Sequence, residues 1–389
     1  MQLDFHYYAT YCAAYLAGYT PEECKVICYS DQFTDLCSKT MLSILHAPLS
    51  AATTQLALEM LDARTDVVGL QEITRIWASF HFLPYDIYAN PKRGTERYKK
   101  KYRLICNSNG DLVIDTVELA KDRDLQAVGL AMHVLADTWA HKYFAGTPSL
   151  VINGTDKFFF EIIKEGDKEI EKPIVFGHSA SKTDDLEEYI FMSTLHRSRE
   201  NSIMNLGHGR AGHLPDYSFI RYKYLPAWGN YEAVIKDNPS DYYQAFCQMV
   251  YAMKYLRGLY PVFEKNRYDT ESVAPWEEEI KEILARRQLD SCADWKALGE
   301  KMTGTAPDDF DPDLYKDEYA KALPKERAKT FLGRFFIAAM RQKSMVTYRI
   351  FKSGNRLAGV SEEFKEKGFR GIDDFALLLE QTEEPEESA

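Results

Sequence analysis

The chain has 389 residues, of which 45% are hydrophobic and 28% charged, and its formal net charge is −11. This composition is typical of a globular protein with one large or two modest domains, long enough to bury a core without disulfides. The acidic balance disfavours binding to long nucleic acid, but it does not exclude a small anionic substrate held by metal ions.

The N-terminal residues predict neither a secretory signal nor a membrane anchor. They include Asp4 and His6 but no Lys or Arg, and no run of about 18 apolar residues occurs in the chain. The seven cysteines lack paired Cys-x-x-Cys spacing. We interpret them as buried, reduced thiols of a cytoplasmic protein, with a redox pair of Cys24 and Cys28 as the alternative.

Apolar periodicity predicts a mainly α fold. Helices are expected from Pro21 towards residue 45, from Pro48 through Met60, over 122–144, from Thr183 to the glycines at 207 and 209, and over about 240–262, 275–287, 290–303, 312–323 and 325–350.

Two segments predict a small β insertion in this helical chain. Short apolar runs flank Asn109-Gly110, which indicates a hairpin over about 103–117, and residues 149–178 are rich in Val, Ile and Phe. We therefore expect a helical metal-binding domain with a β insertion over 1–262. A helical extension packed on it would follow over 263–380, and 381–389 would form a disordered acidic tail.

The segment AVGLAMHVLADTWAHKYF contains the clearest chemical motif. His133, Asp137 and His141 are spaced four apart, so they share one face of a helix, and all three are residue types that bind zinc. The rise from 133 to 141 is about 12 Å, which is too long for one ion with bonds of about 2 Å. Asp137 would therefore bridge two ions; the alternative is a pair of hydrogen-bonded core histidines that Asp137 orients.

This HxxxDxxxH helix resembles the metal helix of the zinc-dependent phospholipase C and single-strand-specific zinc nuclease superfamily. The resemblance implies a multi-helix bundle that binds two or three zinc ions, or another divalent metal, through ligands in a fixed order. In this chain that order is filled by Met1, His6, Asp31, His81, His133, Asp137 and His141. The stretches MQLDFHYYATYCAAYLAGY, FHFLP and LGHGRAGHLPDY also resemble a bacterial family of unknown function.

The residues themselves support part of this assignment. Gln2 is bulky enough to block removal of Met1, which keeps the first amine in place, and the aromatic neighbours of His6 and His81 indicate buried imidazoles. Asp31 fits the family order better than Asp35, but the choice between them stays open.

Two segments compete to supply the last ligands. One is the pair His196 and Glu200, four apart in an expected helix but flanked by arginines. The other is the glycine-rich loop 207–216, which we favour because glycines allow a close approach of the backbone to an ion or phosphate. This loop supplies His208, His213 and Asp216 as ligands and Arg210 as a phosphate contact.

These features predict a cytoplasmic zinc phosphoesterase acting on a small phosphodiester, phosphomonoester or lipid head group. Asp31 would act as acid/base or as a ligand of the third ion. The alternative is a helical module that binds metal without catalysis and serves in interactions.

Overall fold

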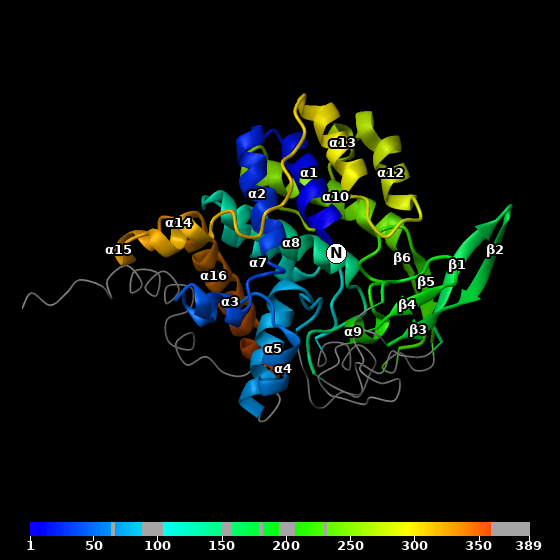
Figure 1. Ribbon diagram of the computed structural model, residues 1–389, viewed down its shortest axis with the longest axis horizontal. Helices are drawn as coiled ribbons and strands as arrows, with labels where there is room; N and C mark the ends of the chain where they lie inside the picture. The colour runs from blue at the N-terminus through cyan, green and yellow to red at the C-terminus, as the bar shows by residue number, and fades with distance from the viewer. Residues whose placement is uncertain are drawn as a thin grey trace, which may run out of the picture.

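The computed structural model describes residues 1–63, 67–87, 104–148, 158–178, 182–193, 207–226, 228 and 232–358. This part of the chain is mainly helical, as predicted, with a small β unit at one side (Figure 1). The N-terminus lies in the middle of the molecule, beside α8 (Leu125–Ala140). This position matters because the first residues belong to the candidate site.

The central helix α8 is buried on every side except at Leu125 and Ala127 near its start. A helix that is apolar all round has to be enclosed by other elements. It is packed against α2 (Pro21–Phe33), α7 (Asp111–Ala120), α10 (Asn238–Leu256) and α16 (Phe331–Lys352). The polar residues that α8 carries, His133 and Asp137, are therefore in the interior of the protein.

The first residues form helical structure that the apolar periodicity did not predict. A π-helical segment, η1 (Asp4–Ala9), runs into α1 (Thr10–Leu16), and both contact α13 (Cys292–Thr303). One hydrophobic core extends from Met1 to Ala358 and includes residues of α12 (Glu277–Ala285) and α16. The described C-terminal helices thus pack on the N-terminal ones, while the division into two domains stays a prediction.

The remaining helical elements are short, apart from α5. They are α3 (Lys39–Ile44), η2 (Leu49–Ala51), α4 (Ala57–Ala63), α5 (Val67–Phe80), α9 (Gly207–Ala211), α11 (Thr270–Val273), η3 (Ala274–Trp276), α14 (Lys316–Lys321) and α15 (Pro324–Arg327).

The β unit consists of two small sheets. The larger is antiparallel, in the order β2 (Lys168–Pro173), β1 (Phe160–Glu165), β5 (Arg221–Tyr224) and β6 (Val234–Asp237). The smaller pairs β3 (Val175–Gly177) in parallel with β4 (Ile190–Met192). The β segment predicted over 149–178 is confirmed for its described part, 158–178, whereas β4, β5 and β6 were not predicted.

Two predicted elements are wrong, and two predicted helices are interrupted: the one from Pro21 towards residue 45 over 34–38, and the one from Pro48 through Met60 over 52–56. Residues 111–117 do not form a hairpin strand but belong to α7, with Gly110 as its N-cap, and residues 105 and 106 make only isolated bridges. Asn109 does take the left-handed conformation of a turn, with φ of 61°, but this turn leads into a helix. The helix predicted from Thr183 is likewise absent over 183–193, where β4 lies; residues 194–206 are outside the described part.

Among the described helices, none is long and apolar enough to span a lipid bilayer. All seven cysteines are free thiols, and six of them are buried. The predicted acidic tail over 381–389 is outside the described residues.

Candidate metal centre

The close crossing of α2 and α8 brings the first candidate side chains together. A Cβ atom on Gly129 would lie 2.2 Å from the Ile27 carbonyl oxygen and 3.1 Å from the Asp31 amide nitrogen. Only glycine therefore allows the two backbones to approach so closely. His133 follows Gly129 by about one helical turn on the same face, which places its ring against Asp31 of α2.

Ten residues spread between positions 1 and 216 form a cluster with Asp137 at its centre. We call them the His/Asp cluster: Met1, His6, Asp31, Asp35, His81, His133, Asp137, His141, His208 and Asp216. They come from the N-terminus and η1, from α2 and the turn after it, from the residue after α5, from α8 and its C-cap, and from α9 with the turn after it.

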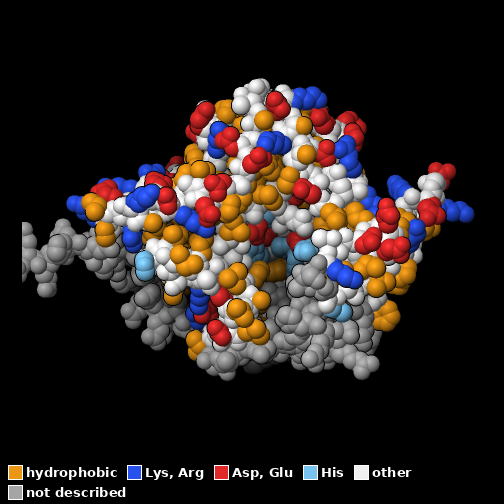
Figure 2. Space-filling view, in the orientation of Figure 1, with side chains coloured by type: hydrophobic (Ala, Val, Ile, Leu, Met, Phe, Trp, Pro, Cys, Tyr) orange, Lys and Arg blue, Asp and Glu red, His pale blue; other side chains and the backbone are white. Residues whose placement is uncertain are grey.

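The cluster is deeply buried on one side and reaches the surface on the other. The side chains of His6, Asp31 and His133 are fully enclosed. Asp35 and His208 are 29% and 20% exposed. Figure 2 shows acidic and imidazole atoms at the bottom of a hollow in this face of the molecule. The exposed edge is the side from which a ligand can approach.

Asp137 lies at the centre and uses both carboxylate oxygens. Its Oδ1 is 3.0 Å from the Met1 amine and 3.3 Å from His6 Nε2. Its Oδ2 is 3.2 Å from His81 Nδ1 and 3.3 Å from His133 Nε2. One carboxylate thus joins two sets of nitrogen donors, as a bridging ligand between two ions would.

Apart from Asp31, the residues of the cluster fall into three groups. The first set, which we call the His81 group, consists of Asp35, His81, His133 and Asp137 and contains the donors that face Oδ2 of Asp137. His81 Nε2 donates to the Thr53 carbonyl at 3.0 Å. In the neutral imidazole this leaves Nδ1 as the unprotonated atom, and it faces Asp137 and, at 3.3 Å, His133 Nε2. Asp35 Oδ1 completes the group at 3.7 Å from His81 Nδ1 and 3.8 Å from His133 Nε2.

The second set, the His141 group, consists of His141, His208 and Asp216. His141 is the C-cap residue of α8, and its Nδ1 donates to the His81 carbonyl at 2.6 Å. Its Nε2 therefore carries the lone pair and lies 3.3 Å from Asp216 Oδ1. His208 Nε2 is 3.1 Å from the same oxygen.

The third set, the N-terminal group, consists of Met1, His6 and Asp137. His6 stacks on His133 with ring centroids 4.0 Å apart. Its Nδ1 is 2.7 Å from Asp31 Oδ1 and its Nε2 is 3.3 Å from Asp137 Oδ1, yet neither buried nitrogen makes a hydrogen bond. Buried polar atoms without a hydrogen-bond partner are rare in native proteins, and an ion or an ordered water can supply the missing partner.

Asp31 is placed to hold imidazoles in position. Its Oδ1 accepts from His133 Nδ1 at 3.1 Å, and its Oδ2 accepts from the Thr10 hydroxyl at 2.6 Å. A neutral His133 has a single lone pair, so an Nδ1–H donated to Asp31 leaves Nε2 free for the His81 group. A carboxylate that orients an imidazole in this way is a common partner of a metal-binding histidine.

The charges of the cluster shift its proton affinities in opposite directions. Burial lowers the pKa of the Met1 amine, but the carboxylates of Asp137 and Asp216 outweigh it and raise this pKa to about 11. In His133 burial again lowers the pKa, while Asp137 and Asp35 raise it to about 10. Without metal, protons on these two groups therefore balance part of the negative charge.

His141 behaves differently because burial dominates there. Burial and the Met1 amine lower the pKa of His141 to about 4 against the attraction of Asp137. Burial alone would raise the pKa of the Asp216 carboxyl, but His208 and Met1 hold it well below its usual range. The unprotonated Nε2 of His141 thus faces a carboxylate of lowered pKa, and both are atom types that can bind a cation.

The donor spacing fits zinc. Two ligands bound at about 2.0–2.1 Å to one tetrahedral zinc ion lie roughly 3.3–3.4 Å apart, whereas N–H···O hydrogen bonds are most often about 2.9–3.0 Å long. Four donor pairs of the His81 and His141 groups are separated by 3.2–3.3 Å. Imidazole and carboxylate are also the ligand types that a borderline cation such as zinc prefers.

Nine of the ten predicted metal ligands are in the cluster, and His213 is not. The His213 side chain is 51% exposed, and its Nδ1 is 3.4 Å from Asp184. The predicted glycine-rich loop over 207–216 is a loop only in part, because residues 207–211 form α9, where Arg210 is buried two residues after His208. His196 and Glu200 are outside the described residues.

Sequence reasoning missed the groups that orient the ligands. Asp35 was only an alternative to Asp31, yet both aspartates contact His133. The Thr53 carbonyl, which accepts from His81, could not be predicted from the sequence, because every residue has a backbone carbonyl. Lys236 of β6 is fully buried and donates to the Trp139 carbonyl at 2.8 Å, near the end of α8 that carries His141.

Comparison with known proteins places the chain in a family. No curated protein and no solved structure matches it. The profile of DUF6765, described as a family of unknown function, matches residues 1–350, a range that contains the whole His/Asp cluster. This confirms the predicted membership of a family of unknown function, while the similarity to the phospholipase C superfamily stays a prediction. The chain belongs to DUF6765.

Proposed function

We propose that this protein is a metal-dependent hydrolase of small phosphate esters, and that the His/Asp cluster holds its ions, with zinc as the metal that suits the donor set best. The observation that carries the proposal is the geometry of His141: its Nδ1 donates to the His81 carbonyl, so its Nε2 lone pair faces Asp216 Oδ1 at 3.3 Å. These two acceptor atoms have the spacing of two ligands on one tetrahedral ion.

The proposal assigns each ligand a group. Asp35, His81, His133 and Oδ2 of Asp137 would hold one ion, and His141, His208 and Asp216 a second. Met1, His6 and Oδ1 of Asp137 would hold a third, with the amine as a ligand. The ligand role thereby passes from Asp31 to Asp35, and Asp31 becomes a positioning residue for His133.

The charge balance supports two or three ions. The four carboxylates of the cluster carry four negative charges when ionised, and its neutral imidazoles carry none. Two divalent ions neutralise these carboxylates, and a third leaves a net positive charge that suits a phosphate ester. Zinc ions, when bound, supply Lewis acidity and lower the pKa of water towards about 7.

The residues at the exposed edge suit the approach of a substrate. Asp35 is more exposed than Asp31, and His208 is the most exposed imidazole of the cluster. The rings of Phe82 and Phe144 lie 5.8 Å and 6.0 Å from the His208 ring and limit the space beside it. A small head group or phosphate ester fits this entrance better than a polymer, as the acidic net charge also suggests.

One observation favours the second candidate function, a metal-binding module without catalysis. The Met1 amine and the side chains of His6 and His133 are fully enclosed, so an ion held there would be closed to substrate. A closed site is typical of structural zinc. Turnover distinguishes the two functions, since both predict metal.

The test combines metal analysis with hydrolysis assays. Protein purified without chelator is expected to contain two or three zinc ions per chain, and to hydrolyse bis(p-nitrophenyl) phosphate or p-nitrophenyl phosphate in a chelator-sensitive, zinc-restored manner. His133→Ala should lose metal and activity. His178→Ala is the matched control, because His178 bonds to Ser193 outside the cluster. Metal without turnover would support the module, and no metal would refute both functions.

The roles of the two aspartates are tested separately. Asp35→Asn should lose the ion of the His81 group. Asp31→Asn should keep the number of ions but bind them about 10–100-fold more weakly, as for other residues that orient metal ligands. If Asp31→Asn loses an ion and Asp35→Asn loses none, the assignment is reversed.

A further inference from the structure

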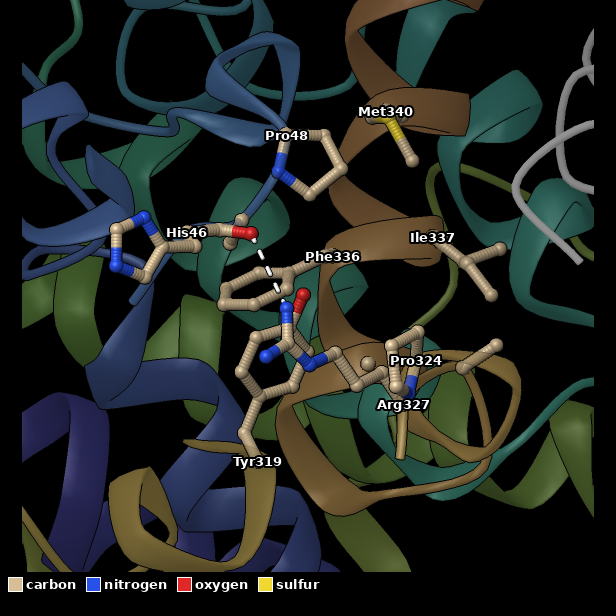
Figure 3. Close-up of a pocket in the computed structure, with 11 residues that line it drawn as sticks. His46, Pro48, Tyr319, Pro324, Arg327, Phe336, Ile337 and Met340 are labelled. Atoms are coloured by element: carbon tan, nitrogen blue, oxygen red, sulfur yellow. Dashed lines mark hydrogen bonds between the residues drawn. The ribbon is translucent and has the colours of Figure 1, made fainter. Parts of the chain in front are cut away.

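A second pocket lies away from the metal centre, between α15, the start of α16 and the turn after α3. It has a volume of about 330 Å³, which is at the lower end of the range for small-molecule sites. Its walls include His46, Tyr319, Arg327, Phe336, Ile337 and Met340, none of which belongs to the His/Asp cluster (Figure 3). The pocket therefore has to be explained separately.

Arg327 gives the pocket a positive charge, and the guanidinium that carries it has only part of its hydrogen-bonding capacity in use. Its Nη1 donates to the His46 carbonyl over a long 3.4 Å, and its buried Nε has no hydrogen-bond partner (Figure 3). A guanidinium offers five N–H donors in one plane, which match the two oxygens of a carboxylate. None of the described residues that line the pocket is acidic.

The nearest acidic residues of α14 and α15 are engaged elsewhere. Glu326 is paired with Lys329 at 3.0 Å, and Glu318 accepts the Phe331 amide at 3.3 Å. Arg327 thus has no carboxylate partner among the described residues, and an anion from solution can take that place.

The other walls are apolar and aromatic. The Tyr319 ring lies under the Arg327 guanidinium at 5.3 Å, and it meets Phe336 edge to face with centroids 5.2 Å apart. Met340 offers a thioether, which packs well against aromatic rings. Two aromatic walls at nearly a right angle suit a flat ring that contacts one face and one edge.

We propose that this pocket binds a small aromatic carboxylate, with its carboxylate on Arg327 and its ring between Tyr319, Phe336 and Met340. One arginine balances one negative charge, so a monoanion fits better than a phosphate dianion. The proposal is independent of the metal centre, because no residue is shared.

The test uses 2-naphthoate as the probe and isothermal titration calorimetry on the full chain, with and without chelator. Saturable one-to-one binding is expected in both conditions. Arg327→Gln should weaken it at least tenfold, because charge-assisted bonds are lost. Arg334→Gln is the matched control: Arg334 lies near the start of α16 but pairs with Asp124 and does not line the pocket, so binding should be unchanged.

Further arms identify the occupant. Ile337→Trp should abolish binding by filling the pocket, and 2-naphthamide, which lacks the charge, should bind at least tenfold more weakly than 2-naphthoate. Equal binding of the amide, or tighter binding of octanoate, would overturn the assignment to an aromatic carboxylate. Binding that survives Arg327→Gln but disappears with chelator would place the probe at the metal centre. If the protein dimerises in the absence of ligand and Ile337→Trp abolishes the dimer, the pocket receives a second copy of the chain instead.

Discussion

Replacement of Asp137 by asparagine tests the centre of the proposed site. Asparagine has nearly the same shape but loses the charge and one of the two oxygens. In the structure these oxygens face two different donor groups: Oδ2 faces the imidazoles of His81 and His133, and Oδ1 faces the Met1 amine and the His6 imidazole. The variant should therefore lose two ions and keep the one held by the His141 group.

The expected loss of stability follows from mass action. An ion present at about 100 times its Kd stabilises the native state by about 2.7 kcal/mol, so two ions contribute about 5 kcal/mol. Unfolding entropy is about 2.1 cal/mol/K per residue, or about 0.8 kcal/mol/K for a chain of 389 residues that unfolds as one unit. The metal-dependent part of the Tm should therefore fall by about 6 °C.

The assay compares the Tm with and without chelator, together with metal content by elemental analysis, for wild type and variant. Because only the chelator-dependent difference is compared, any direct effect of the substitution on the metal-free protein cancels. Asp184→Asn is the matched control, since Asp184 is a buried carboxylate that bonds to Tyr217 outside the cluster. If Asp137→Asn keeps the metal content and the chelator-dependent Tm difference of wild type, Asp137 does not bridge ions and the reasoning fails.

Two further predictions concern protons and the end of α8. The pKa values of about 11 for Met1 and about 10 for His133 keep both groups protonated at pH 7 without metal. Metal binding should thus release about two protons from these two groups, and the metal affinity should rise with pH, by up to tenfold per pH unit for each proton. Calorimetry in buffers of different ionisation enthalpy measures the number of protons released. A measured release of zero would contradict the prediction. Lys236→Met removes a buried bond of 2.7 Å to Asp241 and should lower the free energy of unfolding by about 1.5–3 kcal/mol in urea titrations. The control is Lys223 of β5, which forms an exposed ion pair with Glu171. Lys223→Met should lower the free energy of unfolding by less than about 1 kcal/mol. Equal losses of unfolding free energy in the two variants would show that Lys236 has no special role.

The helical periodicity around the central motif was sufficient to predict its local structure. An amphipathic or wholly apolar run of this length has few alternatives to a helix, and spacing of four then puts His133 and Asp137 on one face. The structure has α8 over Leu125–Ala140 with both residues buried. His141 lies at the C-cap, where the chain turns and the imidazole can join a second donor group.

Short β segments were less predictable because their pairing is not local. The Asn109-Gly110 turn was recognised, but the apolar residues after it pack as one face of α7 rather than as a strand. β4 and β5 form through partners that lie about 15 and 60 residues earlier in the chain. A few apolar residues do not distinguish a strand from a helix without those partners.

The sequence by itself determined the mainly helical fold, the burial of the central motif and the identity of most residues of the His/Asp cluster, since these depend on local periodicity and on side-chain chemistry. Only the tertiary structure decided which donors meet. Asp31 and Asp35 are four residues apart and chemically identical, yet one contacts His133 Nδ1 and the other faces Nε2. His213 and Asp216 are three residues apart, and only Asp216 turns towards His141. Distances of a few ångströms between distant segments are set by the packing of the whole core, including the close crossing at Gly129, and no local pattern encodes them.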